Sequence, residues 1–395
     1  TLNNLKIATG SGSITVNGSA GKTLNLTAAL AALPASLANA FAPDLAAEGT
    51  ISGEVKATGE AANPAVAYRL DWANAATSQT KGAGLSPLAI KANGTFAGGR
   101  LGLDSEVNGS GGLAISGGGN VEVAGAKTLQ LSFKGRVPMA ALQGKLTDQG
   151  LSAEGTADLD VTIAGTSTSP AVTGAVTLNG ARIIDLRRNL TLNDLKGTLR
   201  FDGAQATLSE LTGRLGGGGT ISASGTIGIQ PQSGFPADIA VKLNGATYAD
   251  GTLFTTSASG DLALKGPLLT APVLSGRIAL SKTSITVPEK LPASLSEIDI
   301  RHKNAPAAVK AQARDMRGDE TNGSSSTIGL DLAINASSGI FVRGRGIDAE
   351  LGGDLTIRGT AADPVVAGAF TMRRGRLTIL SRRLDFSSGT ITFGG

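Results

Sequence analysis

The sequence contains no cysteine, which excludes disulfide bonds, thiolate metal sites and a cysteine nucleophile. Charged residues make up only 17% of the 395 residues, aromatic residues only 3%, and the formal net charge is +4. So few aromatic rings offer no stacking platforms for bases, and a small, interspersed charge excess gives no basic patch. We therefore expect no nucleic-acid partner.

Histidine is nearly absent, because His302 is the only one in the chain. It lies in the charged stretch 300–304, which is typical of a solvated surface rather than of a catalytic triad. Carboxylates such as Asp158 and Asp160 have no spacing that indicates a metal or acid–base site. We therefore predict a protein that is not an enzyme, with no catalytic residues, no metal and no cofactor.

Long apolar runs are also missing, since a spanning helix needs about 18 consecutive apolar residues. The nearest candidate, 24–42, contains several polar residues and has Pro34 near its middle. No basic and apolar signal sequence opens the chain at Thr1. We expect no membrane span in this sequence, and we expect any targeting segment to lie outside it.

Glycine, by contrast, is abundant, with 56 residues against a usual share of roughly 7%. Apolar and polar residues alternate along many short stretches, which is the pattern of strands with one apolar face. In the stretch 220–229, Ile221, Ala223, Ile227 and Ile229 share one side while serines and threonines take the other. The composition and this period of two predict an all-β protein.

Turn signals separate these stretches. Asn-Gly and Asp-Gly favour the tight turns of antiparallel hairpins, and together they predict a long antiparallel meander. Asn-Gly begins at Asn17, Asn93, Asn108, Asn179, Asn244 and Asn322, and Asp-Gly begins at Asp202 and Asp250.

Two short segments depart from the alternation and predict helices. In 27–42 and in 138–146, apolar residues recur at spacings of three and four, and Pro34 is placed to begin the first helix. Each helix could be a plug in a groove, a cap or a connector, and we favour a helix that covers exposed sheet.

Sequence repeats follow both segments. The passages 45–50 and 151–156 are nearly identical, and a glycine followed by a proline continues the register in each copy. Proline suits the start of a strand and glycine tolerates a sharp bend, so the motif predicts a corner. We divide residues 1–395 into one continuous body with repeats at roughly 28–137, 138–240, 241–339 and 340–395. The Gly/Pro pairs are Gly59/Pro64, Gly165/Pro170, Gly266/Pro272 and Gly359/Pro364, and a second glycine follows the last three at Gly174, Gly276 and Gly368.

A long sheet with one apolar face must curl, split or be covered. Glycine and alanine let a sheet curl but cannot fill the space that curling encloses. We therefore predict an all-β, long antiparallel meander with one or two short helices, rolled into an incompletely filled trough. A stack of filled β-sandwiches is the alternative interpretation, and residues alone do not separate the two.

The end of the chain resembles a known family. The passage from Gly368 to Phe393 contains a strand-like stretch, the basic run 382–386 and then Gly-Thr-Ile-Thr-Phe at 389–393. It is similar to the C-terminal region of the TamB family, the translocation and assembly module proteins, which are AsmA-like lipid transport proteins. The repeats at 45–50 and 151–156 also look like repeats of that family.

The resemblance implies a periplasmic protein, anchored in the inner membrane, that reaches towards the outer membrane. It implies an all-β fold, a long antiparallel meander curled into an open β-taco groove with one or two short helices. It also implies that this groove is hydrophobic, carries phospholipids and supports outer-membrane protein assembly. The implied partners are phospholipid acyl chains, the barrel protein TamA, through a region beyond this sequence, and the inner membrane, through an N-terminal anchor that this sequence lacks.

Two sets of residues are candidates for that role. The arginines Arg373, Arg374, Arg376, Arg382 and Arg383 are expected to make headgroup or edge contacts, since guanidinium groups bind phosphate and also protect sheet edges. The residues expected to line the groove are Ile221, Ile227, Ile229, Leu262, Leu264, Leu355, Ile357, Leu377, Ile379, Ile391 and Phe393.

Two other functions remain open at this point. A scaffold could pair its strand edges with nascent outer-membrane strands, which relies on backbone hydrogen bonds rather than on apolar contact. A secreted repetitive adhesin is the other alternative.

Overall fold

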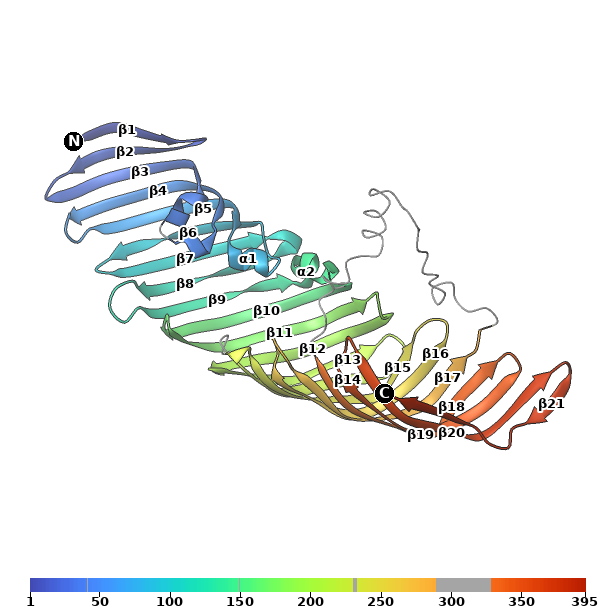
Figure 1. Ribbon diagram of the computed structural model, residues 1–395. Coiled ribbons are helices and arrows are strands. Elements are labelled where there is room, and N and C mark those ends of the chain that lie inside the picture. Colours follow the sequence, from blue (N-terminus) through green and yellow to red (C-terminus); the bar gives the residue numbers. More distant parts are fainter. Residues whose placement is uncertain (41, 149, 230–232, 289–327) are drawn as a thin grey trace, which may run out of the picture. The chain divides into compact units, whose positions relative to one another are not determined.

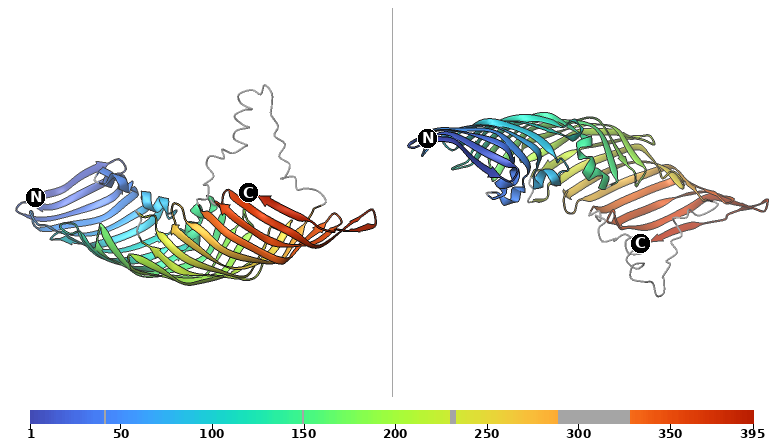
Figure 2. Two further views of the ribbon diagram at one scale, coloured as in Figure 1. Left: turned by 60° about the horizontal axis from the view of Figure 1, so that its bottom comes forward. Right: turned by 90° about the horizontal axis from the view of Figure 1, so that it is seen from above.

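A computed structural model describes residues 1–40, 42–148, 150–229, 233–288 and 328–395, so His302 and Asn322 lie outside the described residues. The chain forms two compact units, Thr1–Gly216 with Thr220–Pro231 and Gly217–Gly219 with Gln232–Gly395. Within each unit the strands lie side by side in a curved layer (Figures 1 and 2).

The first unit is an antiparallel meander in which each strand pairs with the next one along the chain. Its strands are β1 (Leu2–Thr9), β2 (Gly12–Ala20), β3 (Thr23–Pro34), β4 (Glu48–Glu60), β5 (Ala65–Ala76), β6 (Leu88–Ala97), β7 (Arg100–Gly109), β8 (Ala114–Glu122), β9 (Thr128–Pro138), β10 (Leu151–Thr166), β11 (Ser169–Asp185), β12 (Leu190–Gly203), β13 (Gln205–Leu215) and β14 (Thr220–Gly228).

The second unit continues this pattern with one exception, because β17 and β18 pair in parallel. A parallel pair requires the chain to return from the end of β17 to the side where β17 began. The other neighbours are antiparallel, and β20 pairs with both β21 and β22. The strands are β15 (Pro236–Ala249), β16 (Phe254–Pro267), β17 (Val273–Thr286), β18 (Gly329–Gly344), β19 (Ile347–Gly359), β20 (Pro364–Ile379), β21 (Arg382–Asp385) and β22 (Thr390–Gly394).

The interior of these sheets is sparse. Among the described residues, Ile340 is the largest fully buried side chain, at 1% exposure, and alanines such as Ala181 and Ala336 make up the rest. A filled sandwich would bury the leucine and isoleucine side chains of two facing sheets. The predicted fold class, an all-β antiparallel meander curled into an open β-taco groove with short helices, is confirmed.

The two margins of the first unit differ. At one margin, which we call the turn margin, connections of one to five residues join the strands, at 21–22, 61–64, 98–99, 123–127, 167–168 and 204. The opposite helical margin carries the short helices α1 and α2, seen in Figure 1, and the 3₁₀ segments. Its helices are η1 (Ala35–Ala40), η2 (Pro43–Leu45), α1 (Ser78–Gly82), η3 (Ser110–Gly112), η4 (Met139–Leu142) and α2 (Gln143–Asp148).

The helix predicted at 138–146 is confirmed by η4 and α2, but the one predicted at 27–42 is wrong over its first half. Residues 27–34 belong to β3, in which 27–31 pair with β2 and the pairing with β4 extends to Pro34, the last residue of the strand. Helix propensity is a weak preference that tertiary pairing overrides. Helix α1, which begins with a capping box between Thr77 and Thr80, was not predicted.

The Asn-Gly prediction was wrong at four sites. Asn17 and Asn93 lie inside β2 and β6, and Asn179 and Asn244 lie at bulges inside β11 and β15. Bulges also use glycine with positive φ, as at Gly180 and Gly245, so the dipeptide does not distinguish a bulge from a turn.

The Gly/Pro corners are confirmed. Each proline lies at or next to the start of a strand, β5, β11, β17 or β20. The preceding glycines, Gly59, Gly165, Gly266 and Gly359, have φ values between +85° and +104°. In the first unit both corners lie at the turn margin.

Asp185 organises the turn between β11 and β12. Its carboxylate accepts backbone N–H bonds from Arg187 and Arg188, both at 3.0 Å, and a 2.8 Å bond from the Arg188 side chain. Burial raises the pKa of Asp185, but these hydrogen bonds outweigh burial and hold the pKa below its ordinary value.

We expect Asp185→Ala to lower the free energy of unfolding at pH 7 and to flatten its dependence on pH. Because the folded pKa is depressed, the wild-type contribution is present above the unfolded value of about 3.9 and is lost as pH falls through the folded value. Denaturant unfolding of both proteins between pH 2 and 7 measures this difference. A wild-type advantage that stays constant down to pH 2 would contradict the assignment.

Candidate functional site

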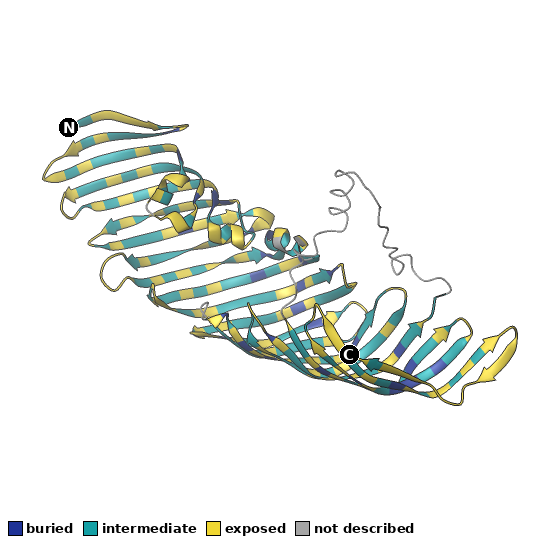
Figure 3. Cartoon of the chain, in the orientation of Figure 1, coloured by how far each residue is buried: buried dark blue, intermediate teal, exposed yellow. Residues whose placement is uncertain are grey.

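The candidate site is the apolar face of each sheet. In the first unit, Trp72, Ile90, Val107 and Ile115 are direct partners across β5 to β8 and so lie on one face. Along β5, residues of this face are half-buried while Arg69 and the others of the opposite face are exposed. Figure 3 shows these alternating bands along the strands.

A second row in the first unit leads to the predicted residues of β14. Leu159, Val176, Leu199 and Leu208 are partners across β10 to β13, and Leu208 is opposite Gly225. Ile221 and Ile227 share the face of Gly225 because strand residues two apart point the same way. Both are half-buried, as is Ile229 just after β14.

The second unit has an apolar face of the same kind, with a row formed by Val241, Leu262, Gly276, Leu332, Ile357 and Val366. Leu264 lies on the same face, opposite Ile239 and Leu274. The structure therefore brings the predicted residues Leu262, Leu264 and Ile357 together.

Leu355 and Phe393 contribute to the main buried cluster of the second unit, which also contains Ile340 and Phe370. The rings of Phe370 and Phe393 meet edge to face, with centroids 6.0 Å apart. Leu355 is only 9% exposed, so its side chain is largely covered by these neighbours.

Leu377, Ile379 and Ile391 lie towards the end of the chain. Leu377 is opposite Ile347 and half-buried, whereas Ile379 and Ile391 are 53% and 47% exposed. The structure places all the predicted lining residues in strands of the apolar faces or directly after one. Their contact with a ligand stays a prediction.

Sequence reasoning missed the apolar residues under the helical margin. Ala75, Leu88, Leu113 and Ala141 form a buried cluster there, with Trp72 packed against it. The indole Nε1 donates a hydrogen bond of 2.8 Å to the Glu48 carbonyl oxygen. The alternation in 66–72 and 88–96 could have found this face, but the covering segments could not be placed from sequence.

Glycines leave the apolar face without a side chain at repeated positions. Gly174, Gly276 and Gly368 are opposite Val161, Leu262 and Leu355. A Cβ on these glycines would lie 2.1, 2.4 and 2.4 Å from a carbonyl oxygen of the neighbouring strand.

Large rings lie beside several of these glycines. Phe201 is the partner of Gly174 on the next strand, and Phe393 is the partner of Gly368. In the first repeat the ring and the glycine exchange places. Tyr68 occupies the position of the repeat glycine, and its partner on the next strand is Gly94. The Tyr68 hydroxyl reaches across to donate a 2.7 Å bond to the Gly102 carbonyl oxygen. Burial raises the pKa of Tyr68.

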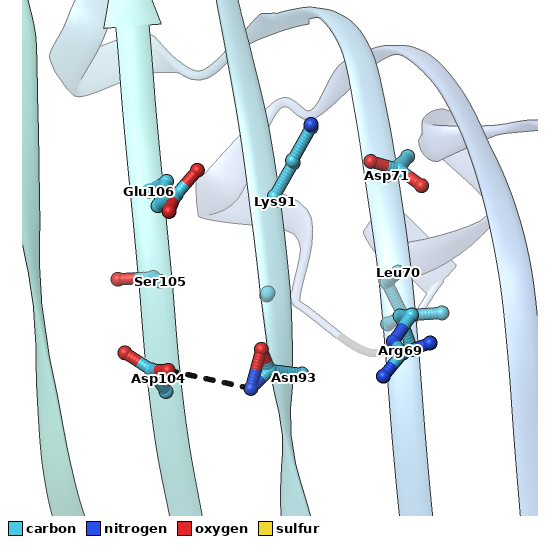
Figure 4. A pocket seen from close by; sticks show the side chains of 9 residues that line it. Arg69, Leu70, Asp71, Lys91, Asn93, Asp104, Ser105 and Glu106 are labelled. Atoms are coloured by element: carbon cyan, nitrogen blue, oxygen red, sulfur yellow. Dashed lines mark hydrogen bonds between the residues drawn. The ribbon is translucent and has the colours of Figure 1, made fainter.

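The opposite faces carry alternating charges. Figure 4 shows Asp71, Lys91 and Glu106 following one another across β5, β6 and β7, with Asn93 bonded to Asp104 at 3.4 Å. These residues line an open depression of about 250 Å³. These charged and polar side chains are exposed, so this face keeps the sheet solvated.

Three of the five predicted arginines lie on the charged face of the second unit. Arg374 pairs with Glu350 at 2.7 Å, Arg376 with Asp348 at 2.8 Å, and Arg383 with Asp385 at 3.7 Å.

The other two arginines differ. Arg373 donates a 3.2 Å bond to the Ser337 carbonyl oxygen. Arg382 is opposite Ile379, on the apolar side, and makes no ion pair with any described residue. The proposed headgroup contacts stay a prediction.

Within the described ranges, no group of three or more histidine, cysteine, aspartate or glutamate residues could hold a metal ion. No helix in those ranges is long and apolar enough to cross a membrane.

The family comparison matches nearly the whole chain. A model of the TamB C-terminal domain matches residues 3–209 and again residues 209–395. No curated protein and no solved structure gave a significant match.

The repeated glycines give a test of the apolar face. Gly174→Ala is expected to lower the free energy of unfolding by about 2 kcal/mol or more, because its φ of +113° and the close Asp160 oxygen both oppose a side chain. Gly144→Ala in α2, where a Cβ meets nothing within 4 Å, is the matched control and should be neutral or slightly stabilising. Equal stability of the two variants in denaturant unfolding would show that the glycine is not required.

Proposed function

Because the chain belongs to the TamB family, we propose that it is part of a non-enzymatic periplasmic bridge that carries phospholipids between the inner and outer membranes. In this proposal the apolar faces hold acyl chains while headgroups stay at the open side. The same protein supports the assembly of outer-membrane proteins.

The observation that carries the proposal is the uncovered apolar face. Leucine, isoleucine and valine side chains follow one another across neighbouring strands, and most remain half-buried instead of packing against a second sheet. Exposed apolar surface on this scale is costly in water and commonly marks a binding surface. An acyl chain gains about 0.8 kcal/mol for each methylene it buries.

The chemistry of the face suits lipid better than a polar substrate. Charged side chains along β5 to β7 and β18 to β20 are concentrated on the opposite face, and those of β19 and β20 form ion pairs there. The apolar face therefore offers contact area but few hydrogen-bonding groups. Such a surface suits a ligand that moves along it better than a ligand that must be held in one fixed orientation.

The partners that follow from this proposal are phospholipid acyl chains, the outer-membrane barrel protein TamA and the inner membrane. In this proposal, the contact with TamA and the anchor in the inner membrane belong to segments outside residues 1–395.

Lipid extraction from the purified chain, followed by mass spectrometry, tests the proposal. We expect phospholipid to copurify and to be displaced by detergent, because the face is apolar and open. Repeated absence of phospholipid from chain purified out of native membranes would overturn it.

A charge on the apolar face should remove lipid binding. Ile357→Asp is expected to reduce bound phospholipid at least tenfold, since a carboxylate would be placed in the middle of an apolar row. Thr356→Asp is the matched control because it adds the same charge to the exposed neighbour on the opposite face. Circular dichroism checks that both variants fold, and equal lipid loss in both would contradict a role for the apolar face.

The same pair separates lipid transport from strand templating. If the protein instead acts by edge pairing of backbone groups, Ile357→Asp should leave the assembly of outer-membrane proteins intact in cells while lipid binding falls.

A further inference from the structure

The hairpin formed by β20 and β21 carries the most exposed large hydrophobic side chain among the described residues. Leu380, at its turn, is 93% exposed. Ile379 and Leu384 in the adjoining strands are 53% and 52% exposed. Leu384 is opposite Leu377, so these aliphatic side chains continue the apolar face towards the tip.

The backbone of this turn makes the leucine unusual. Leu380 and Ser381 have φ values of +47° and +61°, so both central residues of the two-residue turn are in the left-handed region. Turns of this type strongly favour asparagine, aspartate and glycine. A bulky residue with positive φ is strained, and strain of this kind is commonly found at functional positions.

Positive charge surrounds the exposed leucine. Arg382 and Arg383 follow the turn directly, and no carboxylate lies between Ile379 and Arg383. Arg382 has no ion-pair partner in the described part of the chain, and Arg383 has only the exposed Asp385 at 3.7 Å. An exposed ion pair such as Arg383–Asp385 is weak in water. The guanidinium groups of Arg382 and Arg383 are therefore both available to bind an anion.

Protection of the sheet edge explains only part of this arrangement. Arginines on a short edge strand would prevent pairing with another sheet. Edge protection does not explain a fully exposed leucine at a strained position, because an exposed apolar residue favours association rather than opposing it. An apolar tip flanked by cations matches the interface of an anionic bilayer, where the aliphatic group enters the headgroup region and arginines pair with phosphates.

We infer that the β20–β21 hairpin is a membrane-docking tip that inserts Leu380 into a bilayer surface rich in anionic phospholipid. Arg382 and Arg383 bind the phosphates around it. This contact is independent of the proposed transport function, because it needs no lipid on the apolar face of the sheet.

The absence of cysteine allows a direct test, since a single introduced cysteine can be labelled specifically. Leu380→Cys carries an environment-sensitive NBD fluorophore in the 395-residue chain, and Leu269→Cys is the matched control. Leu269 is also exposed, at 67%, but has no arginine beside it. Each protein is mixed with phosphatidylglycerol-containing vesicles or with pure phosphatidylcholine vesicles.

We expect the label at 380 to shift to the blue and brighten severalfold with anionic vesicles only. The response should fall in about 0.5 M NaCl, where the Debye length is about 4 Å. The label at 269 should not respond. No response at 380, or an equal response at 269, would overturn the inference. A response confined to vesicles that contain outer-membrane proteins would also overturn it, and would identify a protein partner.

Unlabelled variants separate binding from folding. Leu380→Gly removes the side chain and relieves the positive φ, so thermal stability should be unchanged or higher while affinity for anionic vesicles in flotation falls about tenfold. Arg382→Glu should weaken the same affinity about tenfold at low salt and little at high salt. Full vesicle affinity in both variants would show that the hairpin does not dock.

Discussion

The backbone hydrogen-bond ladder between neighbouring strands is the interaction on which the rest of this structure depends. Conventional domains rely on a filled core, but among the described residues Ile340 is the largest fully buried side chain, and leucines such as Leu113 and Leu351 are buried in two separate clusters. The strands are instead held by backbone pairing with their neighbours, as between β10 and β11, where fifteen residue pairs are interrupted by one bulge. Because the ladder satisfies the backbone without a second sheet, most side chains of one face need no facing layer to pack against.

Such a sheet must control its own curvature and its own solubility. Bulges and positive-φ glycines occur within the strands, and they bend and twist a sheet without adding volume to either face. Charges of both signs line the opposite face, so that this surface stays hydrated. The helical margin of the first unit covers one end of its apolar rows, whereas the turn margin carries only short connections. Access to the apolar face is therefore unequal at the two margins.

Several errors of prediction have one physical source. Asn-Gly dipeptides and alanine-rich segments indicate only which backbone conformations are locally allowed. An Asn-Gly dipeptide fits either a turn or a strand bulge, and an alanine-rich segment fits either a helix or a strand. The Asn93-Gly94 dipeptide lies within a strand, where Gly94 leaves room for the Tyr68 side chain from the neighbouring strand. Residues 27–34 joined the sheet because strands β2 and β4 were available on both sides. A short stretch of sequence does not show which strands will become its neighbours in the sheet.

Alternation, glycine content and the Gly/Pro corners determined by themselves that this protein is an antiparallel meander with one apolar face. These are local properties, since side-chain direction in a strand follows directly from its period of two. The sequence also indicated the family, which the match over residues 3–395 established. Tertiary structure alone decided the parallel pairing of β17 with β18, the position of the helical margin and the exposure of Leu380. Each of these depends on which strands become neighbours, and that choice is made by contacts between residues far apart in the chain.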